Sequence, residues 1–448
     1  MTAPAPPTRR AASAASSLSR RSFLRGIVPP AAAGLTLAAL EPRRAAAALA
    51  AVRGTTDAPE DVARDESYWF EIQQAFTIDR SMINFNNGGV SPAPAVVQQS
   101  LARNLAFSNE APAYTMWRIL EPQKESVRQQ VARFFGCDAE EIAFTRNASE
   151  SLQTCQLGFD LEPGDQVLTT TQDYPRMITT FQQRERRDGI ELVRFKIPIP
   201  AEDPAEVVRL FEQHVTDRTR LILISHMVNI TGQILDVKPV VQMARRRGIP
   251  TIVDGAHAFA HFHFRHEDLD CDYYGSSLHK WLFAPIGTGL LYVRRDRIAG
   301  LWPLMAAPDT KDEDIRKFEE IGTHPCPHYL AIGDALTFHL GIGPENKTAR
   351  LVYLRDRWAK RVLEHDRVRL HTSLKPGFAC GIATVQIDGV ASGDLADHLW
   401  SRYKIFTVAI QHDEFEGIRV SPSVYSTTEE VDRFADAIEE VARKGLPA

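Results

Sequence analysis

Short apolar segments rich in β-branched residues alternate with amphipathic segments between about residues 142 and 293. The apolar segments have the length of buried strands, and the amphipathic ones repeat with a helical period. We expect strands at residues 166–170, 220–225, 251–253 and 289–293, and helices at residues 147–157, 205–215 and 238–247. This alternation predicts an α/β fold with a mainly parallel sheet covered by helices on both faces. Because ligands of such sheets bind beyond the carboxyl ends of the strands, the loops there are the places to search for chemistry.

The last hundred residues follow a different pattern, with one long helix at residues 347–364 and then mixed elements. We expect strands at residues 383–387, 406–410 and 417–420, a helix at residues 394–403, and a last helix opened by a capping box of Thr427 and Glu430. This pattern predicts a smaller α+β domain. The chain then divides into a leader (1–50), an N-terminal arm (51–81), a large domain (82–345) and a small C-terminal domain (346–448).

The first fifty residues contain seven arginines, no lysine and one acid. Arg20 and Arg21 precede Phe23, a mild apolar run over residues 27–40 follows, and small residues end the segment. These are the three parts of an export signal, and the arginine pair resembles a bacterial twin-arginine signal. We expect export by the twin-arginine machinery to the periplasm or beyond, without a stable membrane anchor, since a spanning helix needs about 20 apolar residues. A disordered tail or a mitochondrial presequence is the alternative.

The charge balance, the cysteine content and the absence of one glycine motif argue against several classes of function. The 448 residues carry a net charge of −5, and residues 51–448 alone hold 45 basic and 56 acidic residues, or about −11. This acidic balance gives no reason to expect a nucleic-acid partner. Five scattered cysteines predict neither a disulfide framework nor a metal site. No G-x-G-x-x-G opens a helix after a strand, which sets aside a dinucleotide-binding oxidoreductase.

Asp254 and Lys280 are the residues with the clearest chemical meaning. Asp254 ends an apolar strand, where a carboxylate needs a cation or a strong donor, and Lys280 lies between another apolar strand and a Gly-rich turn. Pyridoxal phosphate needs both groups, a lysine for its Schiff base and an acid for its ring nitrogen. Taken singly, Asp254 could cap a helix and Lys280 could be a solvated turn residue. Together they favour the cofactor.

The segment from Cys271 to Lys280, followed by Gly287-x-Gly289, resembles the lysine signature of the class V aminotransferase family of fold-type I pyridoxal phosphate-dependent enzymes. Leu278 departs from the small residue common in that family, and the form Leu278-His-Lys-Trp is similar to the isopenicillin-N-epimerase-like branch. The resemblance extends from about Ile83 to Glu430. It implies a seven-stranded-type sheet, a small C-terminal α+β domain and a homodimer with shared active sites.

The resemblance also implies residue roles. Lys280 is the expected Schiff-base lysine, Asp254 the partner of the pyridine nitrogen, and His257 a neighbour of the ring hydroxyl. The remaining cofactor contacts implied are Ala148, Ser149, Ser277 and His279 at the phosphate, Tyr174 stacked on the ring, Asn229 at the ring hydroxyl, and Thr323 at the phosphate of a neighbouring subunit. Arg419 and Asn87 are the expected substrate ligands. Ser149 could instead only start a helix, Tyr174 only pack in a turn, and Arg419 pair with a protein carboxylate.

Several reactions share the first step at such a site, so the signature does not separate racemisation, transamination, elimination and decarboxylation. No cysteine lies in residues 404–418, where desulfurases of the family carry their nucleophile, and Cys326 is expected to be a buried inert thiol. We therefore expect an exported enzyme acting at Cα of an amino acid or an amino-acid-containing metabolite by epimerisation or transamination. Tailoring of a pyoverdine-type siderophore side chain, C–S lysis, and a binding protein without turnover are the alternatives.

A run of four histidines invites a metal interpretation, namely His257, His261, His263 and His266. No matched pattern of carboxylates or cysteines accompanies it, so we expect alternation in an exposed strand and no metal site.

Overall fold

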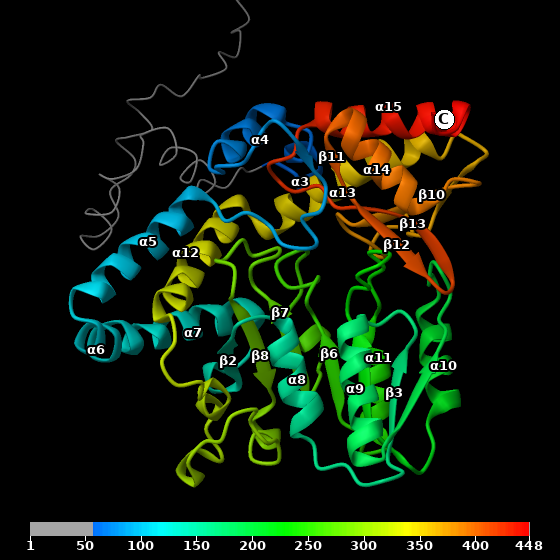
Figure 1. The fold of residues 1–448 in the computed structure, drawn as a ribbon. Helices are drawn as coiled ribbons and strands as arrows, with labels where there is room; N and C mark the ends of the chain where they lie inside the picture. Colours follow the sequence, from blue (N-terminus) through cyan, green and yellow to red (C-terminus); the bar gives the residue numbers. More distant parts are fainter. Residues whose placement is uncertain (1–56, 448) are drawn as a thin grey trace, which may run out of the picture.

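The computed structural model describes residues 57–447, and its centre is a seven-stranded sheet of order β2-β8-β7-β6-β5-β3-β4 (Figure 1). The strands are β2 (Ile142–Thr145), β3 (Gln166–Thr170), β4 (Glu191–Phe195), β5 (Thr219–Ser225), β6 (Thr251–Asp254), β7 (Tyr273–Ser277) and β8 (Gly289–Val293). β8 runs antiparallel to both neighbours, and the other pairs are parallel. This arrangement confirms the predicted mainly parallel α/β fold.

Both faces of this sheet are buried, which explains its near-continuous apolar strands. Along β5, Leu221 and Leu223 belong to a core cluster on one face, whereas Ile222 and Ile224 belong to the cluster on the other. Helices α8 (Ala148–Gly158) and α9 (Pro175–Asp188) cover the first face. The second face is covered by α7 (Glu121–Phe135), α10 (Pro204–His214), α11 (Val237–Arg246) and α12 (Cys326–Ile342).

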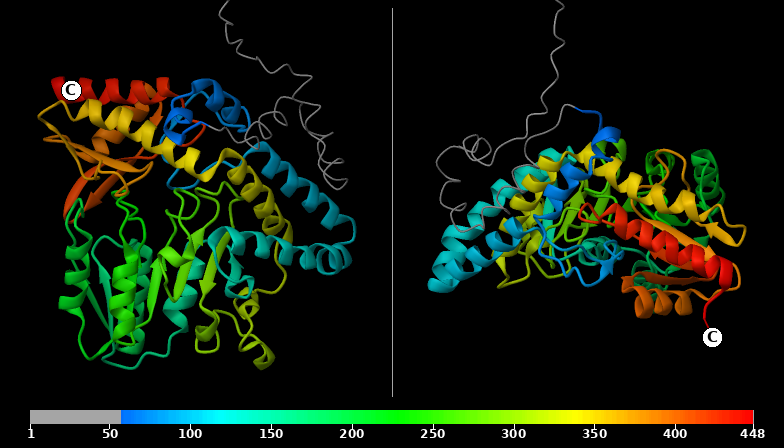
Figure 2. Two further views of the ribbon diagram at one scale, coloured as in Figure 1. Left: turned by 180° about the vertical axis from the view of Figure 1, so that it is seen from behind. Right: turned by 90° about the horizontal axis from the view of Figure 1, so that it is seen from above.

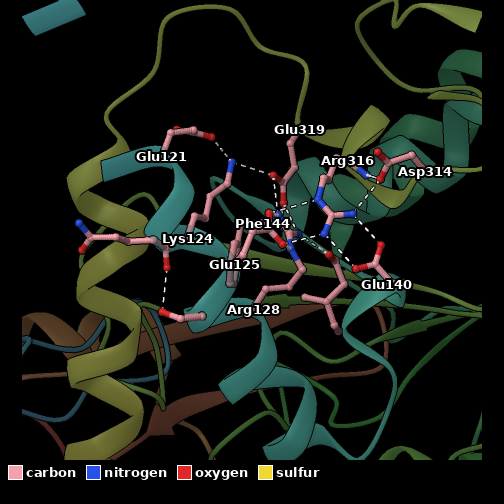
Figure 3. A network of polar contacts seen from close by, with 12 residues as sticks. Glu121, Lys124, Glu125, Arg128, Glu140, Phe144, Asp314, Arg316 and Glu319 are labelled. Carbon is pink, nitrogen blue, oxygen red and sulfur yellow. Dashed lines mark hydrogen bonds and ion pairs between the residues drawn. The ribbon is translucent and has the colours of Figure 1, made fainter. Parts of the chain in front are cut away.

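The hydrophobic pattern does not predict helix α7, because part of the helix face that packs inward is charged. Lys124 and Arg128 point inward and meet Glu319 at the end of a short 3₁₀ segment, η7 (Ile315–Glu319) (Figure 3). Helix α5 (Ala95–Glu110) precedes α7 and packs along α12. The short helix α6 (Pro112–Tyr114) and the π-helix η2 (Thr115–Leu120) connect α5 to α7. The remaining 3₁₀ turns are η3 (Ala139–Glu141), η4 (His266–Asp268), η5 (Arg295–Arg297) and η6 (Asp309–Lys311).

The C-terminal region contains a four-stranded antiparallel sheet of order β12-β13-β10-β9. Its elements are α13 (Pro344–Val362), β9 (Val368–Leu370), β10 (Ala383–Ile387), α14 (Ser392–Tyr403), β12 (Val408–His412), β13 (Phe415–Val420) and α15 (Thr428–Lys444). The predicted capping box is present, with Thr427 Oγ1 accepting from Glu430 N at 3.0 Å. The single strand expected at 406–410 is wrong: β11 (Ile405–Phe406) pairs instead with β1 (Ile83–Asn84) in a separate two-stranded sheet, and β12 begins at Val408, after one intervening residue.

The segment before β1 shows weak periodicity but is folded. Its helices α3 (Pro59–Val62) and α4 (Glu66–Gln73) lie beside α13 (Figure 2). Arg350 of α13, fully buried, donates to the carbonyl of Ala63 at 2.9 Å and to the carboxylate of Glu66 at 2.5 Å. This segment therefore packs against the body of the protein and is not a loose linker. The predicted export signal lies outside the described residues, and no helix within residues 57–447 is long and apolar enough to cross a membrane.

Candidate active site

A pocket of about 520 Å³ opens at the carboxyl ends of the parallel strands, where the small C-terminal sheet meets the large one. Most residues expected to bind the cofactor or substrate line it, namely Ala148, Ser149, Tyr174, Asn229, Asp254, His257, Ser277, His279, Lys280 and Arg419. These residues come from the ends of β6 and β7 and the turns after them, from the loop after β5, from the start of α8, from the turn before α9 and from β13, so the sheet topology brings them together. Thr323 and Asn87 are not among the lining residues.

Lys280 follows β7, and its Nζ lies 3.0 Å from His257 Nε2. Burial lowers the pKa of the Lys280 amine, and the nearby carboxylate of Asp254 opposes this shift only in part. Burial also lowers the pKa of His257 well below its usual value, and the charges of Lys280 and Arg419 lower it further. The pocket therefore holds an amine that loses its proton more easily than an ordinary lysine, next to a neutral imidazole.

Asp254 ends strand β6 at the floor of the pocket. Its Oδ1 accepts from Ala256 N at 2.9 Å, which fixes the carboxylate toward the turn that carries His257. Burial raises the pKa of Asp254, and the Ala256 hydrogen bond and the charge of Lys280 oppose the rise. A buried carboxylate of this kind gains stability from a cationic partner placed against it.

The amino end of helix α8 lines the same pocket. Asn147 caps the helix by accepting from Glu150 N at 2.9 Å, and Ala148 N donates to Ser277 Oγ at 2.9 Å. β8 approaches so closely that a Cβ on Gly289 would lie 2.6 Å from Asn147 N, which explains the glycine in the Gly287-x-Gly289 turn. With the positive end of an 11-residue helix beside serine hydroxyls, this corner suits an anion.

Arg419 reaches the pocket from β13 and is only 7% exposed. Its Nη1 donates to the carbonyl of Asn229 at 3.1 Å, and its Nη2 donates to Asn86 Oδ1 at 2.9 Å. Burial lowers the pKa of Arg419 to about 10. No Asp or Glu of residues 57–447 lies within ion-pair distance of this guanidinium. The alternative of a protein carboxylate partner therefore does not hold for the described residues.

The predicted role of Asn87 as a substrate ligand does not agree with its position in the structure. Its amide is buried and fully used, with Oδ1 accepting from the hydroxyl of Tyr425 at 2.5 Å and Nδ2 donating to the carbonyl of Ser421 at 3.0 Å. It joins the β1 segment to the chain after β13 and does not face the pocket. Sequence reasoning missed its neighbour Asn86, which contacts Arg419; the Asn-Phe-Asn-Asn-Gly-Gly run after β1 was the available signal.

Thr323 lies exposed on the loop before α12, away from the pocket of its own chain. Its predicted contact with a cofactor phosphate would require a second subunit and stays a prediction. The cysteines behave as expected: none lines the pocket, and burial raises the pKa of Cys326 to about 12. A thiol held in this state is a poor nucleophile.

The histidine run forms turns, not the exposed strand expected for residues 257–266. His261 is fully buried, because its ring packs against Trp281 with centroids 3.6 Å apart. Within residues 57–447 no group of three or more His, Cys, Asp or Glu side chains is placed to hold a metal ion.

Comparison with known proteins agrees with this geometry. The family model described as "Aminotransferase class-V" matches residues 83–434, and the chain belongs to that family. Isopenicillin N epimerase of Streptomyces clavuligerus is 28% identical over 388 residues, which cover 83% of this chain and 98% of that protein. Hercynylcysteine sulfoxide lyase of Schizosaccharomyces pombe is 22% identical, with coverage of 81% and 95%.

Solved structures share the fold. The apo cysteine desulfurase of Thermococcus onnurineus has a TM-score of 0.72 at 22% identity, covering 88% of this chain and all of the other. A C-DES mutant with glycine covalently linked to its pyridoxal phosphate cofactor has a TM-score of 0.70 at 22% identity, covering 81% of this chain and 99% of the other. Together with the family, this makes the chain a pyridoxal phosphate-dependent enzyme of fold type I.

The pocket residues fit that cofactor. Three buried polar atoms of the lining residues have no hydrogen-bond partner within the described protein: Asn229 Oδ1, His257 Nδ1 and Arg419 Nε. Buried polar atoms are normally paired, so these atoms indicate a polar ligand. The pocket also offers a half-buried amine at Lys280, a buried carboxylate at Asp254 and an anion site at the start of α8, the groups that the cofactor's aldehyde, ring nitrogen and phosphate require.

Proposed function

We propose that this protein is an exported enzyme that acts at the Cα of an amino acid or an amino-acid-containing metabolite, by epimerisation or transamination. The observation that carries the proposal is Arg419, a buried guanidinium without a carboxylate partner in the described chain, in the same pocket as the Lys280 amine. A planar guanidinium suits bidentate binding of an α-carboxylate. A substrate held in this way presents its Cα to the amine.

When bound, pyridoxal phosphate supplies an electron sink for a bond broken at Cα. The residues that line the pocket would hold and orient this cofactor. Asp254 would hold the ring nitrogen, the start of α8 with Ser277 and His279 would hold the phosphate, and Tyr174 would pack on the ring. Asn229 and His257, each with an unpartnered buried atom, would meet the ring hydroxyl.

Lys280 is the proposed proton carrier at Cα. Its lowered pKa leaves a larger fraction of the amine unprotonated near neutral pH than in an ordinary lysine, which is the state that removes a proton. His257, 3.0 Å away and neutral, holds the amine in place and does not compete with it for charge. His257 is buried and Lys280 is half-buried at the pocket wall, so the amine is held at the surface where a ligand would lie.

The first test locates the reaction on the substrate. Purified holoenzyme is incubated with candidate amino acids and peptides in heavy water, and mass spectrometry locates exchanged or lost atoms. Deuterium at Cα together with the opposite enantiomer supports epimerisation, and a keto acid supports transamination. Lys280→Ala protein is the control. A chain that carries no pyridoxal phosphate after purification and reconstitution would overturn the whole proposal.

C–S lysis is the second candidate. Support comes from the sulfoxide lyase relative, and the pocket lacks any cysteine among its lining residues, so sulfur would have to leave with the product and not on a protein thiol. Release of pyruvate and a sulfur product from a cysteine conjugate would favour this candidate. Release of carbon dioxide would instead favour the tailoring of a siderophore side chain.

We further propose a homodimer whose sites are completed across the interface. Two large aromatic residues, one in α6 and one in η2, are strongly exposed: Tyr114 at 64% and Trp117 at 54%. Soluble monomers rarely expose large hydrophobic side chains in groups, and such groups mark interaction surfaces. Thr323 lies exposed outside its own pocket. Light scattering at twice the chain mass, and weaker cofactor retention by Thr323→Ala, are the expected results. A monomer that retains cofactor fully would refute this part.

Export by the twin-arginine route is proposed from residues 19–25, which lie outside the described structure. A fusion of residues 1–55 to a reporter that is exported only when folded should reach the periplasm. Replacing both Arg20 and Arg21 by Lys should retain it in the cytoplasm, and equal export of both fusions would contradict the route.

A further inference from the structure

A buried cluster behind Lys280 joins three segments that are distant in sequence. Its centre is His261, fully buried, whose ring stacks on Trp281 with an interplanar angle of 12°. Trp281 directly follows Lys280 in the chain. A ring packed face to face against the next residue restricts the backbone from which the Lys280 side chain extends.

The two ring nitrogens of His261 make two different backbone contacts. Gly381 N donates to Nε2 at 3.0 Å, so this nitrogen is the acceptor, and Nδ1 carries the proton that it gives to the carbonyl of His257 at 2.8 Å. A Cβ at Gly381 would lie 3.1 Å from Nε2, so the approach is close. His261 therefore connects the turn that holds His257 to the chain entering β10.

The buried side chain of Lys347 holds the loop that follows Lys280. Lys347 of α13 donates its Nζ to the carbonyl of Trp281 and lies 3.9 Å from the centroid of the Phe283 ring. The two backbone turns in this cluster are strained: Ala260 has φ +59° and Phe283 has φ +64°, unusual values for residues other than glycine. Such conformations persist only where surrounding contacts enforce them, and they gather at functional sites.

The connection at Gly381 leads toward the substrate ligand. Gly381 precedes β10, and in β10 Thr384 is the register partner of Arg419 in β13. His261 thus lies between the loops of Lys280 and His257 on one side and the strand pair of Arg419 on the other. The separation between a carboxylate held by Arg419 and the amine of Lys280 depends on this connection, and misplacement of reacting groups by about 1 Å can cost about 100-fold in rate.

We propose that His261 is a positioning residue that sets the Lys280 amine at its working distance from Arg419, through its stacking on Trp281 and its bond with Gly381. His261 touches neither substrate nor cofactor, because it does not line the pocket. This inference rests on the proposed function for its effect on rate, but the geometry that it predicts for Lys280 exists in the cofactor-free protein as well.

The test replaces His261 by Gln, which keeps a donor and an acceptor but removes the ring, and by Ala, which removes both. The matched control is His214→Gln. His214 also stacks on an aromatic ring, Phe195, and also contacts the carbonyl four residues earlier, but it lies in α10 at the far edge of the sheet (Figure 1). His214 is half-buried, so the control reports the cost of losing the ring stacking and the backbone contact away from the pocket.

Two readouts separate positioning from general stability. In cofactor-free protein, the pH midpoint for reductive methylation of Lys280, followed by mass spectrometry, should rise by half a unit or more in His261→Ala, because an amine no longer held in place is less desolvated and farther from the charge of Arg419. In holoenzyme, the rate of Cα deuterium exchange at saturating substrate should fall about 10- to 100-fold, with KM changed less than 3-fold. His261→Gln should lie between His261→Ala and the wild type.

His214→Gln should move neither readout, whatever its effect on melting temperature. A Lys280 midpoint in His261→Ala equal to that of the wild type would overturn the proposal, as would equal effects of the His261 and His214 variants. If the protein proves to bind no pyridoxal phosphate, the methylation midpoint still decides the positioning of Lys280, so the two proposals fail separately.

Discussion

Two buried clusters of charge in this protein differ in one respect. Around Glu319 the described charges are matched: its carboxylate binds Arg128 at 2.6 Å and Lys124 at 2.8 Å and accepts from Phe144 N at 2.7 Å (Figure 3). Around Lys280, by contrast, the buried cation Arg419 has no carboxylate partner among the described residues. In the first cluster the charged groups satisfy one another, whereas in the second a buried cation remains without an anionic partner among those residues.

The pKa shifts follow the same division. Burial would raise the pKa of Glu319, but the charges of Arg128 and Lys124 reverse this and lower it. At Lys280 and Arg419 burial prevails, and the pKa of each falls. Matched charges stabilise the fold, while a buried cation without a carboxylate, such as Arg419, costs stability and suits an anionic ligand. Four predictions use this contrast, from the largest effect to the smallest.

Replacing Lys280 by Ala should reduce Cα exchange by about 10⁴-fold, since the variant lacks the proton carrier at the reacting carbon. The absorbance band of lysine-bound pyridoxal phosphate should disappear as well. Exchange kinetics and absorbance spectra of the reconstituted variant provide the measurement, and circular dichroism controls for folding. Retention of both activity and band would show that another amine carries the cofactor.

Replacing Glu319 by Gln should destabilise the protein by about 3 kcal/mol, because Arg128 and Lys124 would lose their shared buried carboxylate and keep only the more exposed Glu125 and Glu121. Denaturant unfolding measures the change. Glu140→Gln serves as control, since its pair with Arg316 is half exposed and should cost about 1 kcal/mol or less. Similar losses in the two variants would remove the distinction drawn for the Glu319 cluster.

Arg419→Met should have opposite effects on function and stability. The exchange rate at low substrate should fall about 100-fold, mostly through KM, as the charge-assisted bonds to a carboxylate are lost. The unfolding free energy of the cofactor-free protein should stay equal or rise, because a buried unpartnered cation has been removed. Steady-state kinetics and urea unfolding test both parts, and a loss of several kcal/mol would mean that Arg419 stabilises the fold.

The two clusters should also differ in pH dependence. A carboxyl whose folded pKa is lowered stabilises the protein above its unfolded pKa, so the contribution of Glu319 should begin to decrease at about pH 4.3 and be lost as pH falls through the lower folded pKa. Lys280 also has a lowered folded pKa, so stability again rises with pH, but here the charged form costs stability and the window is higher, from about 8 to about 10.4. Melting temperatures of cofactor-free wild type and Lys280→Met across pH 6–10 should converge as pH increases. Parallel curves would contradict the lowered pKa.

Much of the large sheet could be predicted from sequence, because each buried strand is a short apolar run that needs no distant information. β3 and β8 have the predicted bounds, and Asp254 and Lys280 follow their strands as expected. Helix α7 could not be found in the same way, since its buried Lys124 and Arg128 look like surface residues until Glu319, almost two hundred positions later, is placed beside them.

The site was predictable where local motifs form it and not where distant segments meet. The start of α8 and the Lys280 turn are local patterns, and the structure places both at the pocket. Asn86 and His261 have their roles only because β13 and Gly381 pack against them. The division of the strand expected at 406–410 has the same origin, because β11 leaves that strand to pair with β1.

The contact between Asn86 and Arg419 also limits when this part of the pocket can form during protein synthesis. Its two residues are 333 positions apart in the chain. At about 5–20 residues per second, a ribosome adds the second residue about 15–70 s after the first. The end of the pocket that contains Arg419 thus cannot form until nearly all of the polypeptide has been synthesised, and we expect a nascent chain interrupted before β13 to lack activity however well its large sheet has folded.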